Sequence, residues 1–168
     1  MLIRNEQPED RLAVERLNRD AFGRPDEAEL IERLRADGAI AFSLVAVAMD
    51  RIVGHLVMSW LPTTMDGRDV EALALAPMAV LPKAQRMGVG SKLVAAAVDA
   101  ARDIGAEAVI VLGHPDFYPR FGFSAKLAQR LDGPFSGDAF MALELRPGAL
   151  AGERGLVAYP AAFGIASH

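Results

Sequence analysis

The sequence predicts an α/β protein in which helices cover both faces of a mixed β-sheet. Three observations favour this fold class: strand-like apolar runs recur along the chain, one long amphipathic helix follows a glycine-bearing loop, and strands alternate with helices only in the middle. The 168 residues suit a single domain, because a core of this size buries about 70% of the surface of the unfolded chain.

The N-terminal part predicts one short strand followed by two helices. The strand begins at Leu2 and ends near Pro8. Pro8 and Glu9 suit the first turn of a helix, since proline loses no hydrogen bond there and acidic side chains favour the helix dipole. A second helix follows Pro25 and ends at Gly38, which suits a C-terminal cap.

The next part predicts strands joined by tight turns. Residues 40–49 and 52–61 are rich in β-branched and aliphatic side chains, and the short Asp50-Arg51 connection makes them a hairpin. Asp66-Gly67 marks a further turn of the hairpin type.

The clearest helix is predicted over residues 88–104, and Gly105 suits its C-terminal cap. Apolar side chains recur there at helical spacing: Val89, Leu93, Ala97, Ala101 and Ile104. Short strands are predicted over residues 108–112 and 140–145, and residues 113–122 hold a turn or a brief helix.

Composition excludes several classes of site. The chain has no cysteine, which excludes disulfides, thiolate zinc sites and cysteine nucleophiles. A net charge of −4 argues against general affinity for nucleic acid. The N-terminus lacks an apolar signal core, and no apolar run reaches the roughly 18 residues of a membrane helix. We expect a cytoplasmic protein that binds neither nucleic acid nor membrane.

The sequence also predicts no metal site and no serine hydrolase. His55 lies in a strand pattern and His168 is terminal, so no histidine cluster indicates a metal. The Gly-x-Ser-x-Gly motif of serine hydrolases is absent.

A basic, glycine-bearing loop leads directly into the predicted helix. The first N–H groups of a helix have no intrahelical partner, and the helix dipole adds partial positive charge. Gly88 and Gly90 allow the backbone to approach a ligand closely. Lys83, Arg86 and Lys92 cluster here in a chain that is acidic overall. This pattern predicts a pyrophosphate site.

The loop can also be compared with two known phosphate-binding motifs. The third glycine of a dinucleotide-binding fingerprint is missing after Gly90, and the order Gly-Ser-Lys differs from the Gly-Lys-Ser/Thr of a P-loop. The structural alternative is that the two glycines only make a tight turn into the helix.

The strand before this loop is interrupted by proline. Residues 72–81 contain Pro77, and Pro82 follows. Proline cannot donate to a sheet ladder, so the strand must be bulged or partly unpaired at Pro77. Free backbone groups at that point could pair with an extended amide-containing arm, and pantetheine is such an arm.

The chain resembles the GNAT superfamily of N-acetyltransferases, closest to its YhbS-like branch, because two motifs of the family occur in the family's order. The acetyl-CoA motif of the family appears as Gln85-Arg-Met-Gly88-Val-Gly90, and its later Tyr-x-x-x-Gly-Phe motif appears as Tyr118-Pro-Arg-Phe-Gly122-Phe123. The resemblance covers residues 1–125, with a looser likeness through residues 139–145.

The resemblance implies a GNAT-like α/β (α+β) fold. The central sheet would be mixed and mostly antiparallel, with about six or seven strands, helices on both faces and a splayed, bulged central strand. Residues 1–168 would form a single acetyltransferase domain, in which residues 1–125 carry the core motifs and residues 126–168 supply C-terminal strands and loops.

The resemblance further implies acetyl-CoA as the cosubstrate, with no metal. Backbone amides from Arg86 to Ser91 would hold the pyrophosphate, Met78 and Val80 would offer backbone groups to pantetheine, and the bulge near Met78 would polarise the thioester carbonyl. The implied cofactor-binding residues are Met78, Ala79, Val80, Gln85, Arg86, Met87, Gly88, Val89, Gly90 and Ser91.

Two catalytic residues follow from the resemblance. Tyr118 matches the tyrosine that protonates the departing thiolate, since a phenol is a proton donor at neutral pH; its alternative is a packed aromatic ring. Glu71 matches a carboxylate that acts as base near the start of the central strand, and its alternative is a solvated strand-end charge. His114 or water is a second candidate for the base.

The function implied is transfer of an acetyl group from acetyl-CoA to a primary amine by direct attack. The alternative is a non-catalytic acyl-CoA sensor or regulatory module of the same fold. Transfer of a longer acyl group is open too. The acceptor segments expected by resemblance, residues 22–29 and 123–137, carry no motif that identifies the small-molecule or peptide amine. A homodimer is a further expectation from the family likeness.

Overall fold

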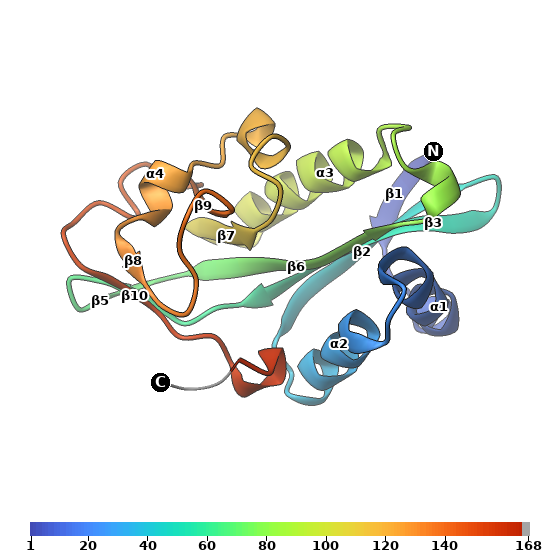
Figure 1. Ribbon diagram of the computed structural model, residues 1–168, viewed down its shortest axis with the longest axis horizontal. Helices are drawn as coiled ribbons and strands as arrows, with labels where there is room; N and C mark the ends of the chain where they lie inside the picture. The colour runs from blue at the N-terminus through green and yellow to red at the C-terminus, as the bar shows by residue number, and fades with distance from the viewer. Residues whose placement is uncertain (166–168) are drawn as a thin grey trace. The chain divides into compact units, whose positions relative to one another are not determined.

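The computed structural model describes residues 1–165 of the chain, which form two sheets and four α-helices (Figure 1). The strand order is β1-β2-β3-β6-β7-β9 in the larger sheet and β5-β4-β10-β8 in the smaller one. The helices are α1 Arg11–Phe22, α2 Asp26–Ala36, α3 Val89–Asp103 and α4 Ala125–Ala128. The strands are β1 Leu2–Asn5, β2 Ile40–Ala48, β3 Arg51–Trp60, β4 Thr63–Met65, β5 Arg68–Val70, β6 Ala72–Val80, β7 Ala108–Leu112, β8 Leu131–Asp132, β9 Phe140–Glu144 and β10 Gly155–Val157.

The larger sheet is mixed and mostly antiparallel, as expected. β2 is antiparallel to β1 and β3, and β7 is antiparallel to β9 but parallel to β6. Hydrogen bonds from the Leu61 N–H to the Ala72 oxygen and from the Leu81 N–H to the Val53 oxygen, both 2.9 Å, join β3 and β6 as antiparallel neighbours. The smaller sheet was not predicted, although its β4–β5 hairpin turns at Asp66-Gly67 as the sequence indicated.

The first compact unit comprises residues 1–59 and 76–97. It contains helices on opposite faces of β3. A Cβ placed on Gly54 would lie 2.7 Å from a methyl of Val89 and 2.9 Å from one of Leu93, whereas the next residue, His55, contacts Asn18 of α1. Successive strand residues point to opposite faces, so α1 and the start of α3 cover opposite faces, as Figure 1 shows.

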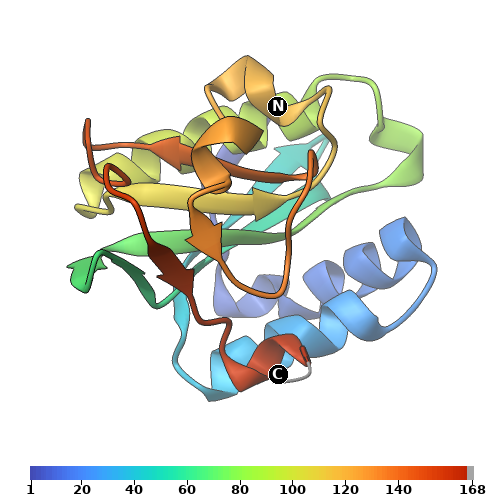
Figure 2. The same cartoon turned by 60° about the vertical axis from the view of Figure 1, so that its left-hand side comes forward.

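The second compact unit comprises residues 60–75 and the chain from residue 98 onward. Here β7 pairs along its whole length with β9, and the smaller sheet brings β8 and β10 together as parallel neighbours (Figure 2). Its core combines apolar side chains of both sheets with some from α4 and from loops: Leu61, Met65, Val70, Ala72, Ala74, Ala108, Ile110, Ala128, Leu131, Phe140, Ala142, Ala149, Leu150 and Val157.

The ladder between β6 and β7 is short. It consists of three pairs, from Ala72–Ala108 to Ala74–Ile110, while β9 pairs with all five residues of β7. The ladder therefore stops before Pro77, which agrees with the partial loss of pairing that the sequence predicted. The β6–β7 ladder leaves the later backbone groups of β6 outside it.

Candidate functional site

The loop between β6 and α3 has a strained and well-anchored backbone. A 3₁₀ turn at Pro82–Ala84 follows β6, and the side-chain amide of Gln85 donates a hydrogen bond of 3.1 Å to the Val80 oxygen. Arg86 and Gly88 adopt positive φ values of 69° and 81°. A positive φ is uncommon for a residue other than glycine and often marks a functional backbone conformation.

Helix α3 begins with N–H groups that lack an intrahelical partner. The first helical hydrogen bond runs from the Lys92 N–H to the Gly88 oxygen at 3.1 Å. The N–H groups of Val89, Gly90 and Ser91 precede it and have no intrahelical partner. These groups, the helix dipole and the nearby basic residues Lys83, Arg86 and Lys92 have the chemistry that suits an anionic ligand.

The position of this helix end is fixed by Gly54, which the sequence did not single out. Because a Cβ at Gly54 would lie within 3 Å of Val89 and Leu93, only glycine lets α3 approach β3 this closely. No local pattern marks such a glycine, since its role comes from a helix that begins 35 residues later in the chain.

A groove of about 690 Å³ lies beside the loop, within the first unit. Its lining includes the basic side chains Arg51, Lys83 and Lys92 and the exposed Met87. The full lining is Met1, Asp20, Ala48, Met49, Arg51, Val53, Leu81, Pro82, Lys83, Ala84, Met87, Val89 and Lys92. Met87 belongs to the motif noted in the sequence, whereas Met1, Met49 and Arg51 had no motif to identify them.

The expected pantetheine-binding segment is the end of β6. Met78 and Val80 are half-buried, and Ala79 between them is buried, as expected for alternating strand residues. The Val80 oxygen accepts the Gln85 amide. The end of β6 and the loop are thus connected directly within the first unit.

Tyr118 lies in the second unit, in a 3₁₀ turn after β7. Its ring makes edge contacts with Phe117 and Phe123, with ring centroids 5.0 and 5.6 Å apart. A Cβ at Gly113 would clash with the ring, so glycine is required there. Burial raises the pKa of Tyr118 to about 12, and the phenol therefore keeps its proton across the neutral range.

The two candidates for the base lie at opposite ends of β7. The exposed Glu71 precedes β6, and its backbone oxygen accepts hydrogen bonds from Glu107 and Ala108 at the start of β7, at 2.6 and 3.3 Å. His114 follows β7, and its backbone oxygen accepts the Tyr118 N–H at 3.3 Å. The second unit thus brings His114 next to Tyr118 and places Glu71 at the far end of the strand.

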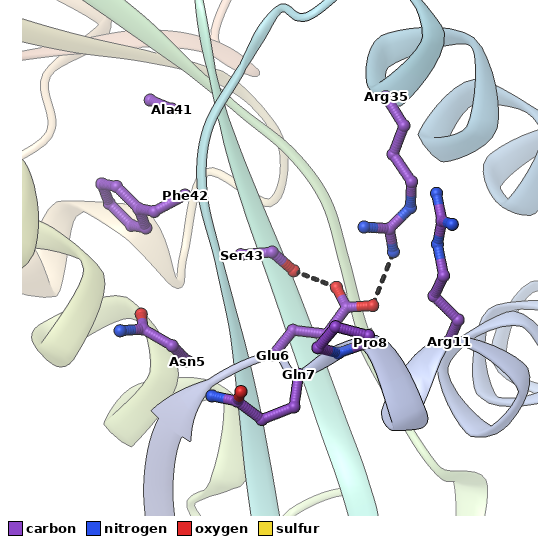
Figure 3. A pocket seen from close by; sticks show the side chains of 9 residues that line it. All are labelled: Asn5, Glu6, Gln7, Pro8, Arg11, Arg35, Ala41, Phe42 and Ser43. Atoms are coloured by element: carbon purple, nitrogen blue, oxygen red, sulfur yellow. Dashed lines mark hydrogen bonds and ion pairs between the residues drawn. The ribbon is translucent and has the colours of Figure 1, made fainter.

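A buried polar cluster in the first unit lies beside a cavity of about 490 Å³ (Figure 3). Glu6 accepts hydrogen bonds of 2.6 Å from both Ser43 and Arg35, and the Ser43 hydroxyl lies 2.7 Å from Nε2 of His55. The Asn18 amide nitrogen, which donates to the Val14 oxygen, lies 3.2 Å from Nδ1 of His55. No pattern in the sequence predicted this cluster.

The direction of its hydrogen bonds excludes a serine nucleophile. Because the amide nitrogen of Asn18 can only donate, Nδ1 of His55 accepts and Nε2 carries the proton. His55 then donates to Ser43, and Ser43 donates to Glu6. An imidazole that donates to the hydroxyl cannot remove its proton, so the cluster is structural.

Because of this cluster, the stability of the fold depends on pH in the acid range. Burial alone would raise the pKa of Glu6, but hydrogen bonds from His55 and Ser43 outweigh it and lower that pKa to about 2, from 4.5. A folded pKa below the unfolded one stabilises the fold above about pH 4.5, and this contribution is lost as the pH falls towards 2. Burial also lowers the pKa of His55, so protonation of this side chain opposes folding in acid.

Glu6→Gln is therefore expected to cost on the order of 3 kcal/mol at neutral pH. The variant should also flatten the pH dependence of unfolding between about pH 4.5 and 2, as measured by urea unfolding across that range. The exposed Glu29→Gln is the control, since Glu29 lies on α2 outside the cluster. Equal acid sensitivity of Glu6→Gln and the natural chain would contradict the assignment.

Within residues 1–165, no group of three or more histidine, aspartate or glutamate side chains could hold a metal ion. His168 lies outside the described residues. No helix in the described part of the chain has the length and apolar character needed to cross a membrane.

Known proteins resemble the chain over nearly its whole length. It is 36% identical over 162 residues to the uncharacterized N-acetyltransferase YhbS of Escherichia coli K12, covering 95% of this chain and 96% of YhbS. A structure of E. coli YhbS in complex with CoA matches with a TM-score of 0.87 and 34% identity, covering 98% of this chain and 92% of that one.

A GNAT family acetyltransferase from Brucella melitensis, solved in complex with acetyl-CoA, matches with a TM-score of 0.79 and 32% identity over 96% of this chain and 97% of that one. The Acetyltransferase (GNAT) family matches residues 10–123, which include the loop, the start of α3 and Tyr118. The chain therefore belongs to the GNAT family of acetyltransferases.

Proposed function

We propose that this protein transfers the acetyl group of acetyl-CoA to a primary amine by direct attack, without a covalent enzyme intermediate. The observation that carries the proposal is the basic loop at the start of α3, where Val89, Gly90 and Ser91 present free N–H groups. The CoA and acetyl-CoA complexes of relatives with 34% and 32% identity support the same cosubstrate here.

The cosubstrate would be held mainly by backbone groups. We propose that the amides from Arg86 to Ser91 bind the pyrophosphate and that Met78 and Val80 offer backbone groups to pantetheine. A backbone N–H near Met78 would stabilise the negative charge that develops on the thioester oxygen during attack. Donors of this kind each contribute a few kcal/mol, on the order of 3.

Tyr118 is the proposed general acid. When the amine nitrogen bonds to the thioester carbon and the C–S bond breaks, the sulfur leaves with the electron pair and takes a proton from the phenol. Burial keeps that proton on Tyr118 at neutral pH, because the pKa is raised to about 12.

The attacking amine must also lose a proton, and Glu71 is the proposed acceptor. Because Glu71 and Tyr118 lie at opposite ends of β7, Glu71 would act through water molecules rather than by direct contact. His114 is the second candidate, since it lies beside Tyr118 in the chain and in space. We further propose that residues 1–168 act as one domain in the cytoplasm.

A non-catalytic acyl-CoA sensor of the same fold is the alternative. It would need the loop from Gln85 to Ser91 but would tolerate loss of Tyr118 and Glu71. Amine-dependent release of the CoA thiol from acetyl-CoA separates the two functions, because only an enzyme links thiol release to the presence of an acceptor.

A further inference from the structure

Gly113 links the end of β7 to the 3₁₀ turn that carries Tyr118, within the second unit. The Gly113 N–H donates a hydrogen bond of 2.9 Å to the Ala139 oxygen. The oxygen of the next residue, His114, accepts the N–H groups of Phe117 and Tyr118 at 3.1 and 3.3 Å. The chain therefore turns back on itself here, and the Tyr118 ring lies against Gly113.

The backbone conformation at Gly113 does not require glycine. Gly113 has no positive φ, in contrast to Gly122, whose φ is 95°. Alanine could therefore keep both the backbone conformation and the hydrogen bond from this N–H. The obstacle to a side chain is the tyrosine ring instead, because the three atoms nearest to an added Cβ all belong to Tyr118. They are Cε2 at 2.4 Å, Cδ2 at 3.0 Å and Cζ at 3.3 Å.

Packing alone sets the place of the Tyr118 ring. Within residues 1–165 no group forms a hydrogen bond with its hydroxyl, and desolvation is the one cause of its raised pKa. Phe117 and Phe123 hold the ring through edge contacts, at interplanar angles of 84° and 73°. Phe123 is itself buried, so it cannot readily move aside. Gly113 adds a contact along the ring edge that ends at Cζ, the atom that carries the hydroxyl.

A single methyl group at Gly113 would move the hydroxyl of Tyr118. Carbon atoms in contact normally lie about 3.5 Å apart, so the Cβ introduced by Gly113→Ala would push Cε2 away by about 1 Å. The ring is rigid, and its hydroxyl therefore moves with it. Misplacing a reacting group by about 1 Å can lower a rate by roughly 100-fold.

We propose that Gly113 is a positioning residue for acetyl transfer. With Phe117 and Phe123 it forms a frame that holds the hydroxyl of Tyr118 where the departing sulfur takes its proton. The proposal rests on the proposed function, because it takes Tyr118 as the general acid. Gly113 would act on kcat alone, since the loop that binds acetyl-CoA in that proposal belongs to the other unit.

Gly113→Ala is expected to lower kcat about 10- to 100-fold and to leave the Kd for acetyl-CoA unchanged. Thiol-release kinetics and calorimetric titration measure the two quantities. In the Tyr118→Phe chain, which has no hydroxyl to misplace, Gly113→Ala should lower kcat no further, because residues that act as a unit have non-additive effects. An equal loss in both backgrounds would overturn the proposal, since the glycine would then serve only the fold.

The position of the ring can be measured without turnover. Tyr118 and Tyr159 are the only tyrosines, so a Tyr159→Phe chain labelled with ring-¹³C tyrosine reports Tyr118 alone by NMR. Gly113→Ala should shift this signal clearly, because the ring moves relative to its aromatic neighbours. An unmoved signal would overturn the proposal. A shifted signal in a protein whose natural chain releases no thiol would instead refute the proposed acetyl transfer.

Gly155→Ala is the matched control for added volume. Gly155 lies in the same unit, has no positive φ, and an added Cβ there would lie 2.5 Å from the sulfur of Met65. This substitution should lower the melting temperature but leave the Tyr118 signal and kcat unchanged. A loss of kcat equal to that of Gly113→Ala would show that overpacking anywhere in the unit is enough, and would contradict a specific role of Gly113.

Phe117→Leu tests the same frame without adding a clash, and it applies also if Gly113→Ala does not fold. The half-buried Phe117 contacts the ring of Tyr118 by its edge, so its loss leaves the hydroxyl less well placed. The substitution should lower kcat about fivefold in the natural chain and have no effect in the Tyr118→Phe chain. Unchanged kcat in the natural chain would contradict a frame that positions the hydroxyl.

Discussion

Replacing Tyr118 with phenylalanine is expected to lower kcat about 100-fold or more, because the departing thiolate loses its proton donor. The substitution removes only the hydroxyl and keeps the ring that packs against Phe117 and Phe123. Affinity for acetyl-CoA should therefore stay unchanged. Steady-state kinetics of thiol release, together with calorimetric titration of acetyl-CoA, measure the two quantities separately.

Tyr159→Phe is the matched control for this result. Tyr159 is the other tyrosine of the chain, it packs between Phe135 and Phe163, and burial likewise raises its pKa to about 12. Loss of its hydroxyl should leave kcat unchanged. If Tyr118→Phe turned over as fast as Tyr159→Phe, Tyr118 would be only a packed aromatic ring.

Gly88→Ala is expected to weaken acetyl-CoA binding about tenfold or more. Gly88 has a φ of 81°, and an L-residue in this left-handed region costs roughly 1–2 kcal/mol. The loop can relieve that strain only by rotating its backbone, which moves the N–H groups of Val89 and Gly90 away from a pyrophosphate. The shift in melting temperature produced by acetyl-CoA measures the loss.

Gly105→Ala is the control that separates the effect of backbone strain from the loss of acetyl-CoA binding. Gly105 has a φ of 84° and, like Gly88, has no atom within 4 Å of an added Cβ, but it follows the other end of α3. Both variants should lose similar stability without ligand. Only Gly88→Ala should lose the response to acetyl-CoA, and an equal response in the two variants would show that the loop does not bind the cosubstrate.

Local features of the fold could be predicted from the sequence. The strand interrupted by Pro77, the glycine-bearing loop and the helix after it are each specified by neighbouring residues, and all three occur where expected. The start of the first helix differs: Pro8–Asp10 form a 3₁₀ turn, and α1 begins only at Arg11. Proline at the first position suits the 3₁₀ turn as well, because its missing N–H is not needed there.

Features that join distant parts of the chain could not be predicted. The parallel pair of β8 and β10 joins strands that are short and carry no periodic signal. The buried cluster joins Glu6, Asn18 and His55, whose spacing matches no motif. The catalytic roles of Tyr118 and Glu71 are proposals, because a motif or a position in the chain identifies a residue but not the proton that it transfers.

If the protein is an acetyltransferase, release of the CoA thiol from acetyl-CoA depends on an amine acceptor. We would follow thiol release by the full chain with and without a panel of primary amines and peptides that have free N-termini. Thiol release should rise with acceptor concentration, reach saturation, and be strongly reduced in Tyr118→Phe. Tight binding of acetyl-CoA with no thiol release above background for any acceptor would contradict it and favour an acyl-CoA sensor.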